Sequence, residues 1–278
     1  MTTAFGPPSL IASDVDGTLI DDDDRVTDRT VAVLTRARAE GVELVLATGR
    51  PPRWIPQITD QLADTPAAVR YAVCANGAIV YDVAADRVLH VAALQPAALA
   101  QIAQLCVDLL PGCGLAAERA GASAFDAATE PFVATPGYEH AWLNPDHVYV
   151  SRDEVVGEPA VKLLARMPGM SSHAMAAAVA PHLGDLAEVT FSIDTGLVEF
   201  SVPATHKASG LSWLTAECDV DGSATIAFGD MPNDIEMLRW AAHGVAMGHG
   251  NPAALDAADE ITASNVDDGV AKVLERWF

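Results

Sequence analysis

The sequence predicts an α/β protein whose core is a doubly wound parallel sheet, with a second α+β module inserted into it. Near both ends of the chain, short apolar runs alternate with amphipathic helical stretches, which is the pattern of a parallel sheet with helices on its faces. Between residues 84 and 202, longer helical stretches alternate with short β-rich runs, and glycine and proline recur. This change of pattern predicts a separate inserted domain at 84–202, with 1–83 and 203–278 forming the core.

The N-terminal part of the core is expected to begin with a buried strand that runs directly into two aspartates. Thr27 is placed to cap the helix that follows, and Gly41 to end it. Asn76-Gly77 is a strong signal for a tight turn between two strands. The expected elements, in chain order, are a strand over 9–13, a helix over 27–40, and strands over 42–47, 71–74 and 78–81.

The C-terminal part of the core repeats the same alternation. Its expected strands cover 225–228, 244–247 and 261–263, and its expected helices cover 232–241, 252–258 and 270–277. In the inserted module, helices are expected over 96–110 and 172–183, and strands over 161–165, 189–193 and 197–202. The stretch from 121 to 159 has weak periodicity and predicts no definite element.

The charge balance excludes two classes of partner. Among 278 residues, 38 acidic side chains outnumber 16 basic ones, so the formal net charge is -22. Such an excess disfavours a nucleic-acid backbone or an anionic membrane as the main partner. The chain shows neither a membrane-spanning run nor a signal peptide, and its four cysteines lack C-x-x-C spacing. We therefore expect a cytoplasmic protein with reduced thiols.

The residues Asp14-Val15-Asp16-Gly17 carry the first chemical signal. Alternate residues of an extended chain share a face, so Asp14 and Asp16 can converge where the first strand ends. Two neighbouring carboxylates repel each other unless a cation or a proton intervenes, and magnesium prefers such oxygen ligands. Taken alone, the motif is equally consistent with an acidic turn. However, Thr48, Asn76 and Asp230 also follow strands of the same predicted sheet, and ligands of such sheets bind at the carboxyl ends of the strands.

Four motifs in chain order resemble those of the haloacid dehalogenase-like superfamily of phosphatases. They are Asp14-Val15-Asp16-Gly17-Thr18-Leu19, Ala47-Thr48-Gly49-Arg50, Lys207 and Gly229-Asp230-Met231-Pro232-Asn233-Asp234. With the Asn76-Gly77-Ala78 turn and Gly244-Val245-Ala246-Met247-Gly248, the finer pattern is similar to the Cof-type branch, subclass IIB. The resemblance covers residues 10–82 and 203–278, and in the inserted module it is architectural only. It implies that this module is a cap domain that selects the substrate.

The resemblance also implies a role for each matching residue. Asp14 would be the nucleophile that forms an aspartyl-phosphate, and Asp16 the general acid and base. Thr48, Gly49, Lys207 and Asn233 would bind the phosphoryl group. A magnesium ion would be held by Asp14, Asp16 through its carbonyl, Asp230 and Asp234. Arg50, Asn76 and Gly77 are candidate substrate contacts, although Arg50 is equally expected to pair with one of the many acids.

The chain departs from the family pattern after Met247-Gly248, where His249-Gly250 replaces the usual Asn-Ala. This departure is expected to affect contacts of the loop and to leave the chemistry unchanged. His206, beside Lys207, is expected to be structural.

The expected function is a magnesium-dependent phosphatase that hydrolyses small phosphorylated metabolites, with sugar phosphates as the substrate class. The enzyme is expected to be a monomer or a homodimer. One alternative is a phosphomutase of the phosphomannomutase type, which uses the same aspartyl-phosphate. Another is a phosphate-accepting signalling module without turnover, although receiver domains of that kind lack a large inserted domain.

Overall fold

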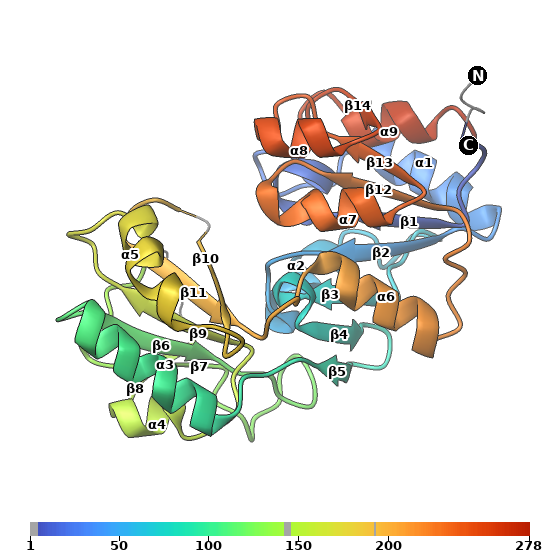
Figure 1. The fold of residues 1–278 in the computed structure, drawn as a ribbon. Helices are drawn as coiled ribbons and strands as arrows, with labels where there is room; N and C mark the ends of the chain where they lie inside the picture. Colours follow the sequence, from blue (N-terminus) through green and yellow to red (C-terminus); the bar gives the residue numbers. More distant parts are fainter. Residues whose placement is uncertain (1–4, 142–145, 192) are drawn as a thin grey trace. The chain divides into compact units, whose positions relative to one another are not determined.

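The computed structural model describes residues 5–141, 146–191 and 193–278, which form two compact units (Figure 1). The first unit combines the N-terminal segment up to His90 with His206–Phe278, and the second is Val91–Thr205. The strand β5 (Arg87–Val91) extends the sheet of the first unit, so the second unit begins later than the position 84 at which the composition changes.

The first unit is built on a mixed, mostly parallel sheet, as the sequence predicts. Within the described residues this sheet has eight strands in the order β14-β13-β12-β1-β2-β3-β4-β5. Neighbouring strands from β14 to β3 are parallel, while β4 returns antiparallel to β3 after the Asn76-Gly77 turn. The strands are β1 (Leu10–Ser13), β2 (Glu43–Ala47), β3 (Tyr71–Cys74), β4 (Ile79–Asp82), β12 (Thr225–Gly229), β13 (His243–Ala246) and β14 (Glu260–Ile261).

The helices of the first unit cover this sheet. They are α1 (Asp28–Ala39), α2 (Pro56–Thr59), α6 (Lys207–Glu217), α7 (Ile235–Trp240), α8 (Pro252–Ala257) and α9 (Gly269–Leu274). Every residue of β1, β3 and β12 is buried, which is why these strands read as continuous apolar runs in the sequence. Thr27 caps α1 as predicted, its side chain accepting a hydrogen bond from the Thr30 amide.

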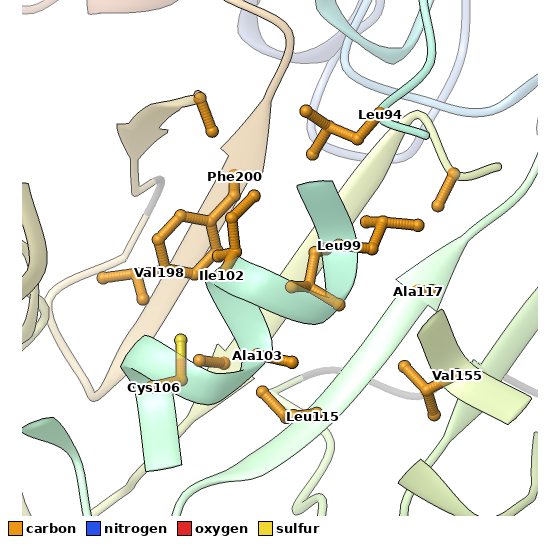
Figure 2. Packing of buried hydrophobic residues seen from close by; sticks show 14 of the residues in the cluster. Leu94, Leu99, Ile102, Ala103, Cys106, Leu115, Ala117, Val155, Val198 and Phe200 are labelled. Carbon is orange, nitrogen blue, oxygen red and sulfur yellow. The ribbon is translucent and has the colours of Figure 1, made fainter. Parts of the chain in front are cut away.

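The second unit is an α+β module whose sheet, within the described residues, has six strands in the order β10-β11-β9-β6-β7-β8. Its elements are α3 (Pro96–Leu109), β6 (Gly114–Glu118), β7 (Phe132–Ala134), β8 (His147–Tyr149), α4 (Arg152–Val156), β9 (Lys162–Arg166), α5 (Ser172–Val179), β10 (Glu188–Thr190) and β11 (Leu197–Ser201). Leu115 and Ala117 of β6 pack with Ile102 and Cys106 of α3 and with Phe200 of β11 (Figure 2). The stretch 121–159, whose periodicity predicts no element, contains β7, β8 and α4.

The strand order of the first unit determines where the functional residues meet. The strands β12, β1, β2 and β3 are consecutive neighbours and run parallel. Their carboxyl ends therefore lie along one edge of the sheet, although they come from distant parts of the chain. Asp230, Asp14, Thr48 and Ala75 each directly follow one of these four strands.

Candidate active site

Three buried carboxylates meet at this edge. Asp14 follows β1, Asp230 follows β12, and Asp234 closes the short turn Pro232–Asp234 that leads into α7. One oxygen atom from each lies within 4.8 Å of the other two. Such a cluster is unfavourable unless positive charge compensates it.

Lys207 supplies part of that charge. It is the first residue of α6 and is fully buried. Its Nζ atom lies 2.5 Å from Asp14 Oδ1 and 2.7 Å from Asp234 Oδ1. Burial alone would lower the pKa of Lys207, but Asp14 and Asp234 together raise it above the ordinary value. Three carboxylates and one ammonium leave two negative charges at the site.

The pKa values of the acids reflect both their burial and this excess of negative charge. Burial raises the pKa of Asp14 well above its ordinary range; Lys207 acts in the opposite direction, while Asp234 and Asp230 add to the rise. Burial and Asp234 likewise raise the pKa of Asp230. The described groups of the site therefore lack enough positive charge to keep all three carboxylates ionised.

Local backbone geometry brings the carboxylates this close. Gly17 has a φ of +76°, and a Cβ atom there would lie 2.6 Å from Asp230 Oδ2, so only glycine fits. The next residue, Thr18, donates its hydroxyl to Asp230 Oδ1 at 3.1 Å. Asp234 Oδ2 accepts the backbone N–H groups of Asp230 and Met231, both at 3.0 Å. Its other oxygen is thereby directed at Lys207.

The loops after β2 and β3 form one hydrogen-bonded unit beside the cluster. Thr48 is buried, and its amide donates to Val73 O at 2.8 Å. The Asn76 amide donates to Thr48 O, and the Asn76 side-chain oxygen accepts from Asn233 Nδ2 at 3.1 Å. Gly49 passes close to this side chain, because a Cβ atom there would lie 3.3 Å from Asn76 Oδ1. Asn76 thus connects two segments that the sequence assigns to phosphate binding.

Gly77 allows the helix that carries Lys207 to pack closely against the turn after β3. It has a φ of +102°, and a Cβ atom there would lie 2.0 Å from the backbone oxygen of His206. The start of α6 can therefore approach the turn only because residue 77 is glycine. His206 caps this helix by accepting the Ser209 amide on Nδ1, which agrees with the structural role expected for it.

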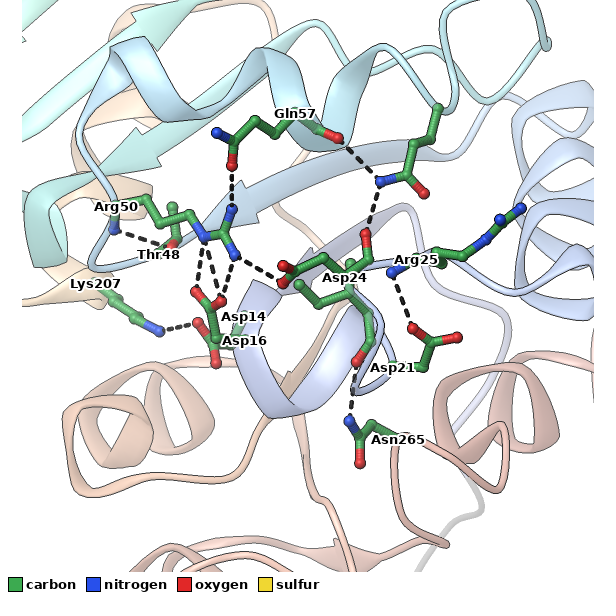
Figure 3. Close-up of polar contacts among 12 residues, drawn as sticks. Asp14, Asp16, Asp21, Asp24, Arg25, Thr48, Arg50, Gln57, Lys207 and Asn265 are labelled. Carbon is green, nitrogen blue, oxygen red and sulfur yellow. Dashed lines mark hydrogen bonds and ion pairs between the residues drawn. The ribbon is translucent and has the colours of Figure 1, made fainter. Parts of the chain in front are cut away.

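Asp16 lies apart from the three buried acids. Its side chain is 56% exposed and forms a salt bridge with Arg50, with Asp16 Oδ1 2.6 Å from Arg50 Nη2 (Figure 3). Of the two expectations for Arg50, pairing with an acid is the one that the structure shows. The carboxylate of Asp16 is not part of the cluster that could hold a metal.

The comparison with known families agrees with this geometry. Residues 11–274 match the family model described as haloacid dehalogenase-like hydrolase. The chain belongs to the haloacid dehalogenase-like hydrolase family. This confirms the family expected from the four motifs.

Two relatives of this haloacid dehalogenase-like hydrolase share one name with each other, that of a phosphatase. A 5-amino-6-(5-phospho-D-ribitylamino)uracil phosphatase of Bacillus subtilis is 30% identical over 277 residues, which cover 98% of each chain. A second Bacillus subtilis protein of that name is 25% identical and covers 96% of this chain and 95% of its own. The protein is therefore similar over nearly its whole length to enzymes named as phosphatases.

Solved structures show the same fold. A phosphatase of this superfamily from Bacteroides thetaiotaomicron has a TM-score of 0.78 at 22% identity, covering 97% of this chain and 95% of that one. A protein described as a subclass IIB sugar phosphatase has a TM-score of 0.76 at 22% identity, covering 96% and 98%. In the described part of this hydrolase, no helix is long and apolar enough to cross a membrane.

The loop that carries His249 contacts the site of this hydrolase at Asp230, and the expectation that this departure leaves the chemistry unchanged stays a prediction. The His249 Nε2 atom lies 3.8 Å from Asp230 Oδ2. The loop is held against Asp230, because the Asn251 amide donates to Asp230 O at 2.7 Å, and a Cβ atom at Gly250 would lie 2.8 Å from that oxygen. The sequence signal was present, since the histidine stands where the family usually has asparagine.

The acidic cluster of this hydrolase fits a divalent cation on two counts. Hard cations such as Mg²⁺ take oxygen ligands, and Asp14, Asp230 and Asp234 offer one carboxylate oxygen each within a small region. The two negative charges left after pairing with Lys207 are those that one divalent cation would balance.

Proposed function

We propose that this haloacid dehalogenase-like hydrolase is a magnesium-dependent phosphatase that hydrolyses small phosphorylated metabolites through an aspartyl-phosphate. One observation carries the proposal: the Asp14 carboxylate is held by a fully buried lysine at 2.5 Å, inside a cluster of acids that requires one more cation. A carboxylate in such surroundings suits nucleophilic attack on a phosphoryl group, whose charge the same cations would neutralise.

The chain's own residues divide the chemistry into two steps. In the first, an Asp14 oxygen bonds to phosphorus while the bond from phosphorus to the ester oxygen breaks, and Asp16 gives its proton to the departing oxygen. In the second, Asp16 takes a proton from water as that water attacks phosphorus, which releases phosphate and restores Asp14. Lys207 holds Asp14 in place throughout.

The cation would be held by Asp14, Asp230 and Asp234, with the Asp16 carbonyl as a further ligand that the family resemblance suggests. It would supply Lewis-acid stabilisation of the phosphoryl oxygens. Thr48 and Gly49 lie at the end of β2, next to β1, where the Thr48 hydroxyl and the Gly49 backbone N–H can meet those oxygens. Asn233, bonded to Asn76, and Gly77, packed on α6, contribute mainly by holding these loops in place.

The names of the relatives support a proposal for the substrate class. The substrate named for both Bacillus subtilis proteins carries its phosphate on a ribityl chain, which is a sugar alcohol. One structural neighbour is described as a sugar phosphatase. We therefore assign sugar and sugar-alcohol phosphates as the class to test first, with the second unit as the cap domain that selects among them.

The deciding experiment is a screen of phosphorylated metabolites scored by release of inorganic phosphate, with and without Mg²⁺. Sugars and sugar alcohols phosphorylated on a primary hydroxyl should be hydrolysed, EDTA should abolish release, and Asp14→Asn should be inactive. Equal release by wild type and Asp14→Asn would refute the mechanism. An isomerised sugar phosphate without phosphate release would identify a mutase. If no substrate in the screen releases phosphate, the proposed turnover is refuted.

A further inference from the structure

The guanidinium group of Arg50 is almost completely occupied by protein partners (Figure 3). Nε lies 3.0 Å from Asp16 Oδ2 and 3.2 Å from Oδ1, and Nη2 lies 2.6 Å from Oδ1. Nη2 also contacts Asp24 Oδ1 at 3.4 Å, and Nη1 donates to Gln57 Oε1 at 3.1 Å. An arginine side chain has five N–H donors, and these contacts use four of them.

The face of the guanidinium that is used decides what Arg50 can do. An arginine that binds a phosphoryl group typically presents two parallel N–H donors to it. In Arg50 the pair formed by Nε and Nη2 already grips the carboxylate of Asp16. The other pair of donors, on Nη1 and Nη2, contacts Gln57 and Asp24, so bidentate binding of a phosphate would require Arg50 to give up one or more of these protein partners.

The arginine is also anchored where it stands. Its amide donates to Thr48 Oγ1 at 3.1 Å, and its carbonyl oxygen accepts from the Ala75 amide at 3.0 Å. Its two outer partners are linked in turn, because Gln61 Nε2 donates to the backbone oxygens of Asp24 and Gln57, both at 2.9 Å. The side chain of Arg50 is 14% exposed, whereas that of Asp16 is 56% exposed. The fixed member of the pair is therefore Arg50.

We propose that Arg50 is a positioning residue for Asp16 and not a ligand of the substrate phosphate. Asp16 lies on a turn and faces solvent, so its carboxylate has no other described side chain to fix its direction. Arg50, held by Asp24 and Gln57, aims it at the place where the leaving oxygen and the attacking water must be. This inference rests on the proposed function, in which Asp16 transfers both protons.

The two possible roles of Arg50 predict different kinetics. A misdirected general acid lowers the rate of the chemical step by about 10- to 100-fold, while substrate affinity is left nearly unchanged. Loss of a phosphate ligand would raise KM and weaken phosphate binding for every substrate. Arg50→Gln removes the charge, and Arg50→Lys keeps the charge but loses the planar fork. Positioning requires both variants to lose kcat.

The decisive test is a double-mutant cycle that combines Arg50→Gln with Asp16→Asn. If Arg50 acts only through Asp16, the double variant should have the same kcat as Asp16→Asn, within about twofold. Multiplication of the two single losses would overturn the inference. Arg38→Gln is the matched control, because this arginine also pairs with an acid, Glu43, but does so at the start of β2, away from the site, and it should keep wild-type kinetics.

Phosphate binding is measured separately by calorimetry, so the inference can fail independently of the proposed function. The affinity of Arg50→Gln for inorganic phosphate should stay within about twofold of wild type, and a tenfold loss would overturn the inference even if no substrate is turned over. Melting temperatures of all variants show whether each is folded. Failure of the wild type to release phosphate from any ester would instead refute the proposed function.

Discussion

Replacing Lys207 with methionine should unfold the first unit at a markedly lower temperature. The ammonium is fully buried and forms two ion pairs, at 2.5 Å to Asp14 and 2.7 Å to Asp234. Methionine fills a similar volume but leaves three carboxylates without their protein counter-charge. Removing one partner of a buried ion pair costs about 3–5 kcal/mol. For a domain of this size that corresponds to a fall in Tm of about 6–20 °C.

The other two lysines of the chain provide matched controls. Lys162 pairs with Glu199 at 2.9 Å in the second unit and is 14% exposed, so Lys162→Met should have a smaller effect on Tm. Lys272 is exposed on α9, and Lys272→Met should change stability by less than about 0.5 kcal/mol. The assay is thermal unfolding followed by circular dichroism in EDTA, repeated with Mg²⁺.

Magnesium sharpens the test. Without the ammonium, the cluster has one more negative charge to offer a cation, so Mg²⁺ should raise the Tm of Lys207→Met more than that of wild type. Hydrolysis should nevertheless be lost, since Asp14 is no longer held. A fall in Tm no larger than that of Lys272→Met would show that Lys207 does not compensate the buried acids, and the charge argument for the cation would fail with it.

Three further predictions test other parts of the site. Because the pKa of Asp14 is raised, the metal-free folded state keeps a proton that the unfolded chain has lost; its Tm should fall as the pH rises above the ordinary aspartate range, and fall less in Asp14→Asn. Gly77→Ala should cost several kcal/mol by chemical denaturation and weaken hydrolysis, whereas Gly41→Ala, with a φ of +87° and open space, should cost only about 1 kcal/mol; equal costs would contradict the close approach to α6. His249→Asn should change Mg²⁺ affinity by about tenfold in calorimetry, because partners of ligating carboxylates tune metal binding, and an unchanged affinity would show that His249 does not act on Asp230.

The sequence was informative wherever local patterns determine structure. Short, mostly apolar runs such as Leu10–Ser13 are long enough to be strands and too short to be helices. The strand-end motifs could also be recognised, because their residue types and their order in the chain resemble the motifs of the family. The elements of the second unit between residues 121 and 159 could not be predicted from the sequence. The strands β7 and β8 are only three residues long, and they are stabilised by pairing with strands that are distant in the chain.

Other features of the site were decided by the tertiary structure. The sequence shows Gly77, but it does not show that the carbonyl group of His206, 129 positions later in the chain, lies close to this glycine. It contains His249, but not the 3.8 Å separation from Asp230. Spacing alone left Arg50 open to either a phosphate or an acid, since a guanidinium forms bidentate pairs with both groups.

The sequence by itself determined the family and the order of its motifs along the chain, because these depend on residue type and local periodicity. Only the tertiary structure decided which charges share one buried space. Asp14, Asp234 and Lys207 come from separate segments of the chain. They are brought together because β1 and β12 are parallel neighbours and because α6 packs closely against Gly77. The raised pKa of Asp14 depends on this arrangement. Electrostatic interaction depends on separation in space, which the order of residues does not record.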